Sequence, residues 1–358
     1  MQQKFRIFLY IIRPNGICVK ICDYVNQNTG LQCSIDLSER KVPEMSVIAK
    51  AGLLALAAVL LLPAAQTGQA AEEAPFIVVV QSQPDTPERT LRVLRDGSVE
   101  ETALDTYLTQ VVLSEMPADF ATEALKAQAV AARTFALANR GRHSAEGYDL
   151  CATTQCQSYG GVAGEETGSN AAIAATYGDV LMYRGKLIDA VFHTDSGGWT
   201  DSSQAVWGTD IPYLQPAKER ETKTQPWTRR WTTSEFAAKL AKKKSIGTLK
   251  SIQLTPLTIG KSASDRSASG RVTAATFVGT KGSVRLTGND LRSLLGLPST
   301  LFDLRLDGTT VTATGYGAGH GLGLSQWGAK AFADAGQDAK AILAHYYVGT
   351  TLKELYKK

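Results

Sequence analysis

The chain has 358 residues, of which 44% are apolar and 20% are charged, and its formal net charge is +4. This composition is typical of a globular protein, and the length suffices for one large domain or two ordinary ones. The mild positive charge is spread along the chain without an aromatic-rich basic cluster, so we expect no nucleic-acid partner.

Residues 1–44 lack the hydrophobic patterning of a globular domain and contain three cysteines. We interpret them as a mis-assigned start or a disordered extension, and we expect no packed structure there. If these residues are part of the protein, the apolar stretch 5–12 is a weak membrane-contacting segment.

The segment from Met45 has the three parts of a secretory signal. Lys50 supplies the positive charge, 51–62 is the apolar stretch, and 68–70 offers small residues at a cleavage site. We therefore interpret 45–70 as a signal peptide and expect an exported, extracytoplasmic protein, either secreted or in the cell envelope. The apolar stretch is shorter than the ~20 residues that a comfortable membrane span needs, and an uncleaved membrane anchor is the alternative.

Strands and helices follow one another without regularity from residue 71 onward. Residues 71–99 are predicted leader strands. Apolar residues at i, i+3, i+4 and i+7 predict a helix over 104–112, and the almost wholly apolar run 121–138 predicts a second, buried helix. Further helices are predicted at 170–176, 234–242, 288–295, 329–335 and 338–347. Strands are predicted at 75–81, 90–94, 180–183, 187–193, 249–254, 271–278, 283–286, 301–306 and 310–314. This mixture predicts the α+β class, with helices packed on mixed or antiparallel strands.

Glu115 stands just before the predicted buried helix. Lys126 and Arg133 lie seven residues apart on that helix and project from one face. Buried charges need partners, and Asp119 occupies the position of a helix cap, which leaves Glu115 as the freer acid. A carboxylate among buried groups at a helix entrance can transfer protons, whereas a structural ion-pair network is the competing interpretation.

Two glycine-rich segments carry further polar side chains. The run 315–328 contains His320, Ser325 and Gln326, and its glycines allow close backbone approach to a ligand. It lacks the lysine of a phosphate-binding loop, which argues against nucleotide binding, and a tight bulge and hairpin is the alternative. The run 192–198 brings His, Asp and Ser together, but neighbours in a strand point to opposite faces, so we discount a catalytic triad.

Cys151 and Cys156 are the two cysteines of the exported part. In an oxidising compartment such a pair often forms a disulfide, and we prefer a disulfide or free thiols over a metal site. His143 lies just upstream, so a three-ligand metal site is the competing one. Gln155 is not a good zinc ligand, and no fourth ligand is obvious.

Taken together, these segments resemble the sporulation stage II protein D (SpoIID/LytB) family. The matching segments occur in family order at 115–117, 124–133, 156–161, 193–198, 206–208, 212–214, 319–329 and 346–350. The resemblance implies that residues 100–357 form a single elongated catalytic domain with a substrate groove. It also implies a peptidoglycan lytic transglycosylase, which cuts glycan strands between N-acetylmuramic acid and N-acetylglucosamine and leaves a 1,6-anhydro end. The implied substrate is glycan strands stripped of stem peptides.

The resemblance also implies roles for individual residues. Glu115 matches the catalytic acid. The expected substrate-binding residues are Lys126, Arg133, His193, Ser196, Gly197, Gly198, His320, Ser325, Gln326 and either Tyr346 or Tyr347. Some members bind zinc near the positions of His143, Cys151 and Cys156, but Gln155 stands where such a member can carry a histidine. We therefore expect no required cofactor, with a structural zinc as the alternative to the disulfide.

One carboxylate suffices for the implied reaction, because the substrate supplies its own nucleophile. The acid protonates the leaving oxygen and then takes the proton of the muramic C6 hydroxyl, which attacks the anomeric carbon. Other candidate acids are Asp105, Asp195, Asp201 and Asp210. Cations beside Glu115 would lower its pKa, so we expect Lys126 or Arg133 to face the lactyl carboxylate or N-acetyl carbonyl of the sugar. The competing function is a non-catalytic wall-binding module or an enhancer of a cell-wall amidase; a hydrolase that leaves reducing ends is a third hypothesis.

Overall fold

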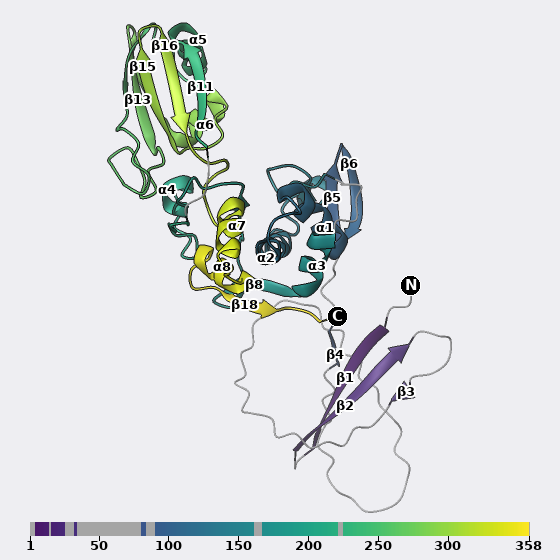
Figure 1. Cartoon of the computed structure of the whole chain (residues 1–358). Coiled ribbons are helices and arrows are strands. Elements are labelled where there is room, and N and C mark those ends of the chain that lie inside the picture. The colour runs from purple at the N-terminus through teal and green to yellow at the C-terminus, as the bar shows by residue number, and fades with distance from the viewer. Residues whose placement is uncertain are drawn as a thin grey trace, which may run out of the picture. The chain divides into compact units, whose positions relative to one another are not determined.

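The computed structural model describes residues 4–13, 16–25, 32–33, 80–83, 90–160, 167–220 and 225–357 (Figure 1). These residues fall into two compact units. The N-terminal unit spans residues 1–89 and the main unit spans residues 90–358.

The N-terminal unit contains a four-stranded antiparallel sheet in the order β3-β2-β1-β4. Strands β1 (Lys4–Arg13) and β2 (Gly16–Val25) pair along their whole length. Strand β3 (Gln32–Cys33) pairs with β2, and β4 (Val80–Gln83) pairs with β1. The structure thus has strands within 1–44, where we expected no packed structure.

The structure does not test three predictions for this region. The predicted signal peptide at 45–70 and the first part of the predicted strand at 75–81 lie outside the described residues. The interpretation of residues 1–44 as a mis-assigned start stays a prediction.

The main unit has two hydrophobic cores, and the first belongs to a helical lobe, which we define as residues 90–220 and 316–357. Helix α2 (Thr122–Ala138) lies at its centre and contacts α1 (Leu104–Glu115), α3 (Thr167–Ala175), α7 (Gln326–Asp334) and α8 (Ala339–Tyr346) (Figure 1). Alanine is the commonest residue of α2, and its small side chain allows neighbouring helices to approach closely. The buried helix predicted from the apolar run is therefore confirmed.

Two small sheets flank these helices. Strands β5 (Thr90–Arg95) and β6 (Ser98–Ala103) form a hairpin, and β7 (Leu150–Cys151) pairs with β5 in parallel. The hairpin turn consists of Asp96 and Gly97, whose φ angles of 50° and 80° fit the two-residue turns that favour Asp-Gly.

The second sheet of the helical lobe is centred on β8 (Asp179–Tyr183). Strands β9 (Lys186–Leu187) and β18 (Thr351–Glu354) pair with its two edges in antiparallel fashion. Separately, β10 (Phe192–His193) pairs in parallel with β17 (Leu324–Ser325), which joins the two histidine-containing segments. The short helices of this lobe are η1 (Ser144–Glu146) and α4 (Ser203–Trp207).

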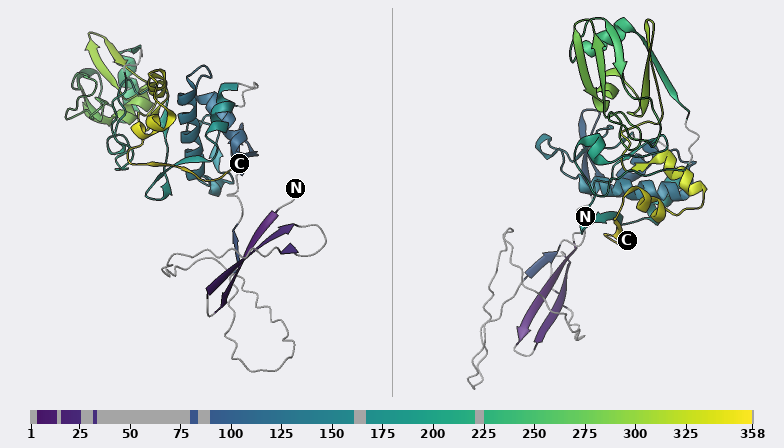
Figure 2. Two further views of the ribbon diagram at one scale, coloured as in Figure 1. Left: turned by 60° about the horizontal axis from the view of Figure 1, so that its bottom comes forward. Right: turned by 90° about the vertical axis from the view of Figure 1, so that its left-hand side faces the viewer.

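The second core belongs to a strand lobe, which we define as residues 225–315. Its two three-stranded sheets are visible in Figures 1 and 2, together with α5 and α6. The first sheet consists of β11 (Trp227–Thr232), β16 (Thr310–Gly315) and β15 (Phe302–Asp307), in that order. The second consists of β12 (Leu249–Gln253), β13 (Ala274–Gly279) and β14 (Gly282–Thr287).

Capping boxes define where the two helices of the strand lobe begin. Thr232 and Glu235 exchange hydrogen bonds at the start of α5 (Thr233–Ala241), and Thr287 and Asp290 do so at the start of α6 (Gly288–Leu295). The side chains of Leu291 and Leu295 then anchor α6 in the core.

The α+β class is confirmed, while several local expectations are wrong. Helix α1 runs to Glu115 and not only to residue 112, so the acid is the last residue of α1 while it stands before α2 as expected. Residue Ala121 precedes α2 as its N-cap without a side-chain bond, and Asp119 does not cap it. Helix α4 lies within the predicted loop 195–207, and strands β11 and β18 were not predicted. Among the described residues, no helix combines the length and apolarity that a membrane crossing demands.

Candidate functional site

The side chain of Glu115 lines a cavity of about 520 Å³, which we call the Glu115 cavity. This volume falls in the range of small-ligand sites. Both lobes contribute to its wall, because Arg292 and Pro298 belong to the strand lobe. The other lining residues are Phe135, Arg142, Thr154, Gln155, Cys156, Asp189, Val191, Phe192, His193, Thr194, Trp207, Ala318, Gly319 and His320. Of the alternative acids Asp105, Asp195, Asp201 and Asp210, none lines this cavity.

Two neutral donors hold the Glu115 carboxylate. The backbone N–H of Ser158 donates to Oε1 at 2.7 Å, and the Gln326 side-chain amide donates to Oε2 at 3.2 Å. No lysine or arginine of the described residues forms an ion pair with this carboxylate. The acid is therefore oriented by hydrogen bonds, with no cation fixed beside it.

The expected partnership of Glu115 with Lys126 and Arg133 is wrong. Lys126 Nζ binds Glu123 at 2.7 Å, one turn earlier on the same helix. Arg133 is fully buried, and its guanidinium donates to the carbonyl oxygens of Thr176 at 2.7 Å and Ile173 at 3.3 Å. These carbonyls lie at the C-terminal end of α3, so Arg133 caps that helix. Neither cation lines the Glu115 cavity, and we withdraw both as substrate-binding residues.

Two neutral histidines line the cavity. His193 Nδ1 lies 3.0 Å from the carbonyl oxygen of Leu322, which can only accept, so Nδ1 carries the proton. The Nε2 of His193 is then an acceptor, and it is buried without a partner among the described residues. His320 has the opposite tautomer, since its Nε2 faces the Phe192 carbonyl at 3.0 Å and its Nδ1 accepts from the Leu322 N–H at 3.0 Å.

The electrostatics keep both rings neutral. Burial lowers the pKa of His320 to about 4. Burial, and next the neighbouring His320, lowers the pKa of His193 well below 6.5. The ring centroids lie 5.2 Å apart, so a proton on one would oppose a proton on the other. Both histidines line the same cavity as Glu115, as expected from the sequence.

The predicted serine and glycine ligands hold the loops together and do not line the cavity. Ser325 Oγ accepts the N–H of Ser196 at 3.1 Å and caps α7. Ser196 Oγ accepts the N–H of Gly198 at 3.0 Å. Gly197 has a φ of 75°, and a Cβ there would meet the side chain of Leu301 at 2.7 Å. These residues satisfy one another inside a tight turn, which leaves them unavailable to a ligand.

Both C-terminal tyrosines are buried and do not line the cavity, contrary to the expected substrate-binding role of one of them. Tyr347 Oη donates to the Val191 carbonyl at 2.8 Å and accepts the Leu324 N–H at 3.3 Å, so it supports the strands β10 and β17. Tyr346 Oη donates to Glu219 at 2.9 Å. Burial raises the pKa of Glu219 to about 7, and sequence analysis did not identify this carboxyl.

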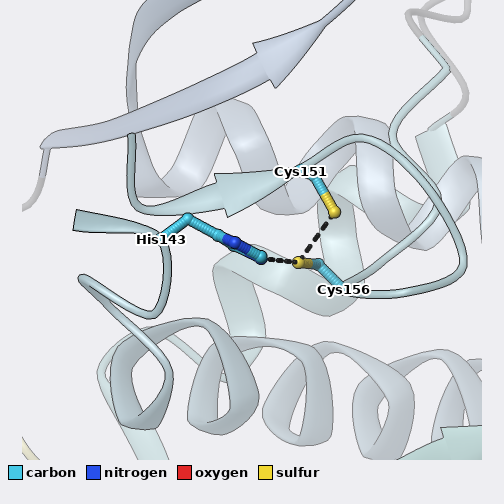
Figure 3. Close-up of side chains that lie close together, drawn as sticks. All are labelled: His143, Cys151 and Cys156. Atoms are coloured by element: carbon cyan, nitrogen blue, oxygen red, sulfur yellow. Dashed lines mark hydrogen bonds between the residues drawn. The ribbon is translucent and has the colours of Figure 1, made fainter. Parts of the chain in front are cut away.

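His143, Cys151 and Cys156 converge beside the Glu115 cavity (Figure 3). The two sulfur atoms lie 2.9 Å apart as free thiols, well beyond the ~2.05 Å of a disulfide bond. The structure therefore holds the two cysteines as free thiols and not as a disulfide. Burial and the adjacent Cys151 sulfur raise the pKa of Cys156 to about 11.

These three residues fit a zinc ion. Their ligand atoms all lie within 4.8 Å of one another, and one imidazole with two thiols is a zinc donor set. The remaining nitrogen of His143, Nδ1, lies 3.1 Å from a Glu146 carboxylate oxygen, the kind of outer contact that orients a metal-binding histidine. Within the described part of the chain no fourth His, Cys, Asp or Glu joins the group.

The same loop that carries the cysteines also positions Glu115. Ser158 supplies the N–H to the acid, and Gln157 accepts a hydrogen bond from Tyr107 at 2.9 Å. Gln157 also donates to the carbonyl of Ala132 in α2 at 3.2 Å. The loop that follows Cys156 thus links the two cysteines to the Glu115 carboxylate.

Sequence analysis missed four lining residues that can contact a ligand. Trp207 is 43% exposed, and its ring centroid lies 6.1 Å from that of His320. Asp189 accepts from the Asn139 amide at 2.9 Å. Arg142 and Arg292 are the arginines of the cavity. Trp207 lies in the matching segment 206–208, which could have identified it as a site residue, whereas no local pattern marked the other three.

Comparisons with known proteins agree with the sequence resemblance. A model of the SpoIID family, described as "Stage II sporulation protein", matches residues 95–183, which include Glu115 and the three metal-type ligands. A second model, a domain of unknown function (DUF8618), matches residues 211–323. The chain is 36% identical to stage II sporulation protein D of Bacillus amyloliquefaciens over 279 residues, which cover 72% of this chain and 76% of that protein.

Two further relatives come from Bacillus subtilis. Its stage II sporulation protein D is 34% identical over 275 residues, which cover 72% of this chain and 76% of the relative. Its amidase enhancer is 31% identical over 291 residues, which cover 68% of this chain and 40% of the relative. On these similarities, the chain belongs to the stage II sporulation protein D family.

Proposed function

We propose that this chain is an exported lytic transglycosylase of peptidoglycan, with Glu115 as both the acid and the base. The observation that carries the proposal is the position of Glu115, a carboxylate held by two neutral donors in the wall of a ligand-sized cavity. The family membership supports this assignment, because Glu115 lies within the matched segment.

Cleavage of the glycan requires one side chain that first donates a proton and then accepts one. Protonated Glu115 donates to the oxygen between N-acetylmuramic acid and N-acetylglucosamine as that bond breaks. The resulting carboxylate then accepts the proton of the muramic C6 hydroxyl while the C6 oxygen bonds to the anomeric carbon. The products are a 1,6-anhydro end and a free N-acetylglucosamine hydroxyl, without addition of water. A hydrolase would instead use two carboxylates in most families, and the second lining acid is Asp189, whose Oδ1 accepts from the Asn139 amide.

Two other lining groups suit a glycan. The neutral Nε2 of His193 can accept a hydrogen bond from a sugar hydroxyl or acetamido N–H. The exposed ring of Trp207 offers an apolar face for a sugar ring. Strands stripped of stem peptides are the proposed form of the substrate.

We also propose that His143, Cys151 and Cys156 hold zinc. When bound, the ion would act as a structural clamp that replaces the thiol protons and fixes the loop on which Ser158 lies. The chain's own contribution to the reaction stays with Glu115.

The alternative function is a non-catalytic module that assists a cell-wall amidase. The 31% identity to the amidase enhancer favours it, although this chain spans only 40% of that protein.

Substitution of the acid tests the proposal. Glu115→Gln keeps the shape and an acceptor oxygen for the Ser158 N–H, and Gln326 can turn its amide oxygen toward the new NH₂. The amide cannot shuttle a proton, so release of soluble fragments from denuded glycan should fall by about 10²–10⁴-fold. Glu101→Gln changes an exposed residue of the same lobe and should retain the wild-type rate. A Glu115→Gln protein with the wild-type rate would refute the assignment.

A further inference from the structure

Arg292 is the arginine whose placement in the Glu115 cavity is not explained by the fold. It lies on α6 and lines the cavity from the strand lobe, whereas Glu115 belongs to the helical lobe. Its guanidinium makes no hydrogen bond or ion pair with any described residue. His193 and His320 line the same cavity, and the positive charge of Arg292 contributes to the lowered pKa of both histidines.

The buried arginines of the described residues, unlike Arg292, each donate to protein acceptors, although Nε of Arg133 and Nε and Nη1 of Arg271 have no partner. Arg133 donates to backbone carbonyls of α3, and Arg271 donates to the Ser196 carbonyl at 2.6 Å. Arg266 donates to the Thr255 carbonyl at 2.6 Å and contacts the Asp303 carboxylate at 3.3 Å. Arg292 is half-buried, and burial lowers its pKa with no neighbouring acid to oppose the shift. A charge partly removed from water gains from a charged partner, and a ligand in the cavity can supply that partner to Arg292.

Neither acid of the cavity forms an ion pair with Arg292 in this structure. The carboxylate of Glu115 is held by Ser158 and Gln326, and that of Asp189 is held by Asn139. The second lining arginine, Arg142, is exposed on a turn and lies 3.5 Å from the Asn139 side-chain oxygen. Arg292 is therefore the cation best placed for an anionic group that enters the cavity.

We propose that Arg292 binds a carboxylate of the glycan, the lactyl group that muramic acid has and N-acetylglucosamine lacks. This proposal rests on the proposed function, in that it assumes a glycan in the Glu115 cavity. A planar guanidinium pairs with a carboxylate through two parallel hydrogen bonds. The rigid start of α6, with its Thr287 and Asp290 capping box, fixes the helix that carries this group. Arg292 thereby selects muramic-acid-containing strands over chitin-like strands, the role that we had assigned to Lys126 or Arg133 from sequence.

A binding experiment tests this without depending on turnover. The full chain with Glu115→Gln is titrated by calorimetry with a denuded peptidoglycan tetrasaccharide. The second ligand is the same saccharide after reduction of its lactyl carboxylates to alcohols. We expect about 10- to 100-fold weaker binding of the reduced saccharide, the range for a hydrogen bond to a charged group. Adding Arg292→Gln should weaken binding of the native saccharide by the same factor and leave binding of the reduced one unchanged, which also reports an intact fold.

Two further variants sharpen the result. Arg292→Lys should restore part of the preference for the carboxylate. Arg305→Gln removes the same charge from an exposed site of the same lobe that does not line the cavity, and should keep the full preference. Equal weakening of both saccharides by Arg292→Gln, or an undiminished preference for the native one, would overturn the proposal.

The outcome is separable from that of the proposed function. A wild-type chain that makes no anhydro ends, yet shows an Arg292-dependent carboxylate preference, would refute the reaction and support the binding role. A chain that makes anhydro ends without that preference would support the reaction and refute the role of Arg292.

Discussion

The backbone N–H of Ser158 donates to Oε1 of Glu115 at 2.7 Å, which ties the candidate acid to the loop that contains Cys151 and Cys156. The loop is short, so a change at the cysteines is transmitted to the acid within a few residues. The geometry of the acid therefore depends on how the His143, Cys151 and Cys156 cluster is held.

The first prediction concerns that cluster. The purified chain should bind one zinc ion, and Cys156→Ser should abolish the binding because it removes one of three ligands. Inductively coupled plasma mass spectrometry measures the zinc content of both proteins directly. After chelation, both Cys151 and Cys156 should react with an alkylating reagent without prior reduction. Recovery of the two residues as a disulfide-linked peptide from freshly prepared protein would contradict the zinc assignment.

The second prediction separates the two cations of α2. Arg133→Met should lower the free energy of unfolding by about 3 kcal/mol or more, because it removes a charged donor from several buried carbonyls. Lys126→Ala should lower it by only about 0.5 kcal/mol, because its pair with Glu123 is partly exposed. Urea unfolding followed by circular dichroism gives both values. Similar losses for the two variants would show that Arg133 does not cap α3 as described.

Arg133 and Arg292 show which features of the site the sequence alone could not predict. Apolar patterning located α1 and α2 closely, a helix was also predicted at 288–295 where α6 lies, and the motif at 115–117 located the acid. The sequence could not predict the cap made by Arg133, because its acceptors are backbone carbonyls at the end of another helix. Arg292 was equally hidden, because only the packing of the strand lobe brings α6 to the cavity. Tyr346 and Tyr347 were assigned to the substrate because the motif revealed their importance but not their burial.

The third prediction concerns Glu219 and the pH dependence of stability. Folding raises the pKa of Glu219 from 4.5 to about 7, so its contribution to stability is full below pH 4.5 and is lost as the pH rises through 7. Folding lowers the pKa of His320 from 6.5 to about 4, so its contribution is full above pH 6.5 and is lost as the pH falls. The two slopes oppose each other between pH 4.5 and 6.5.

Glu219→Gln should therefore expose the histidine slope. The variant should lose up to about 1.4 kcal/mol of unfolding free energy per pH unit, relative to wild type, as the pH falls through that window. Urea unfolding at a series of pH values measures the slope, with Glu101→Gln as the exposed control. Parallel pH profiles for wild type and Glu219→Gln would contradict the raised pKa.

The fourth prediction concerns Trp207. Trp207→Ala should raise KM for denuded glycan by about tenfold through loss of an aromatic stacking surface, with a smaller change in kcat. Trp327 is a matched control, since it is 45% exposed, packs on Phe120 and does not line the cavity. Steady-state kinetics compares the two, and an equal rise in KM for Trp327→Ala would argue against a specific role for Trp207.

The central claim is that one carboxylate, Glu115, cleaves the glycan with the muramic C6 hydroxyl as the nucleophile. Mass spectrometry of the products that the purified wild-type chain releases from denuded peptidoglycan is the most direct test. The account predicts fragments that end in 1,6-anhydro-N-acetylmuramic acid and disappear with Glu115→Gln. Fragments that carry an added water at a reducing end, or no fragments from active, folded protein, would contradict it.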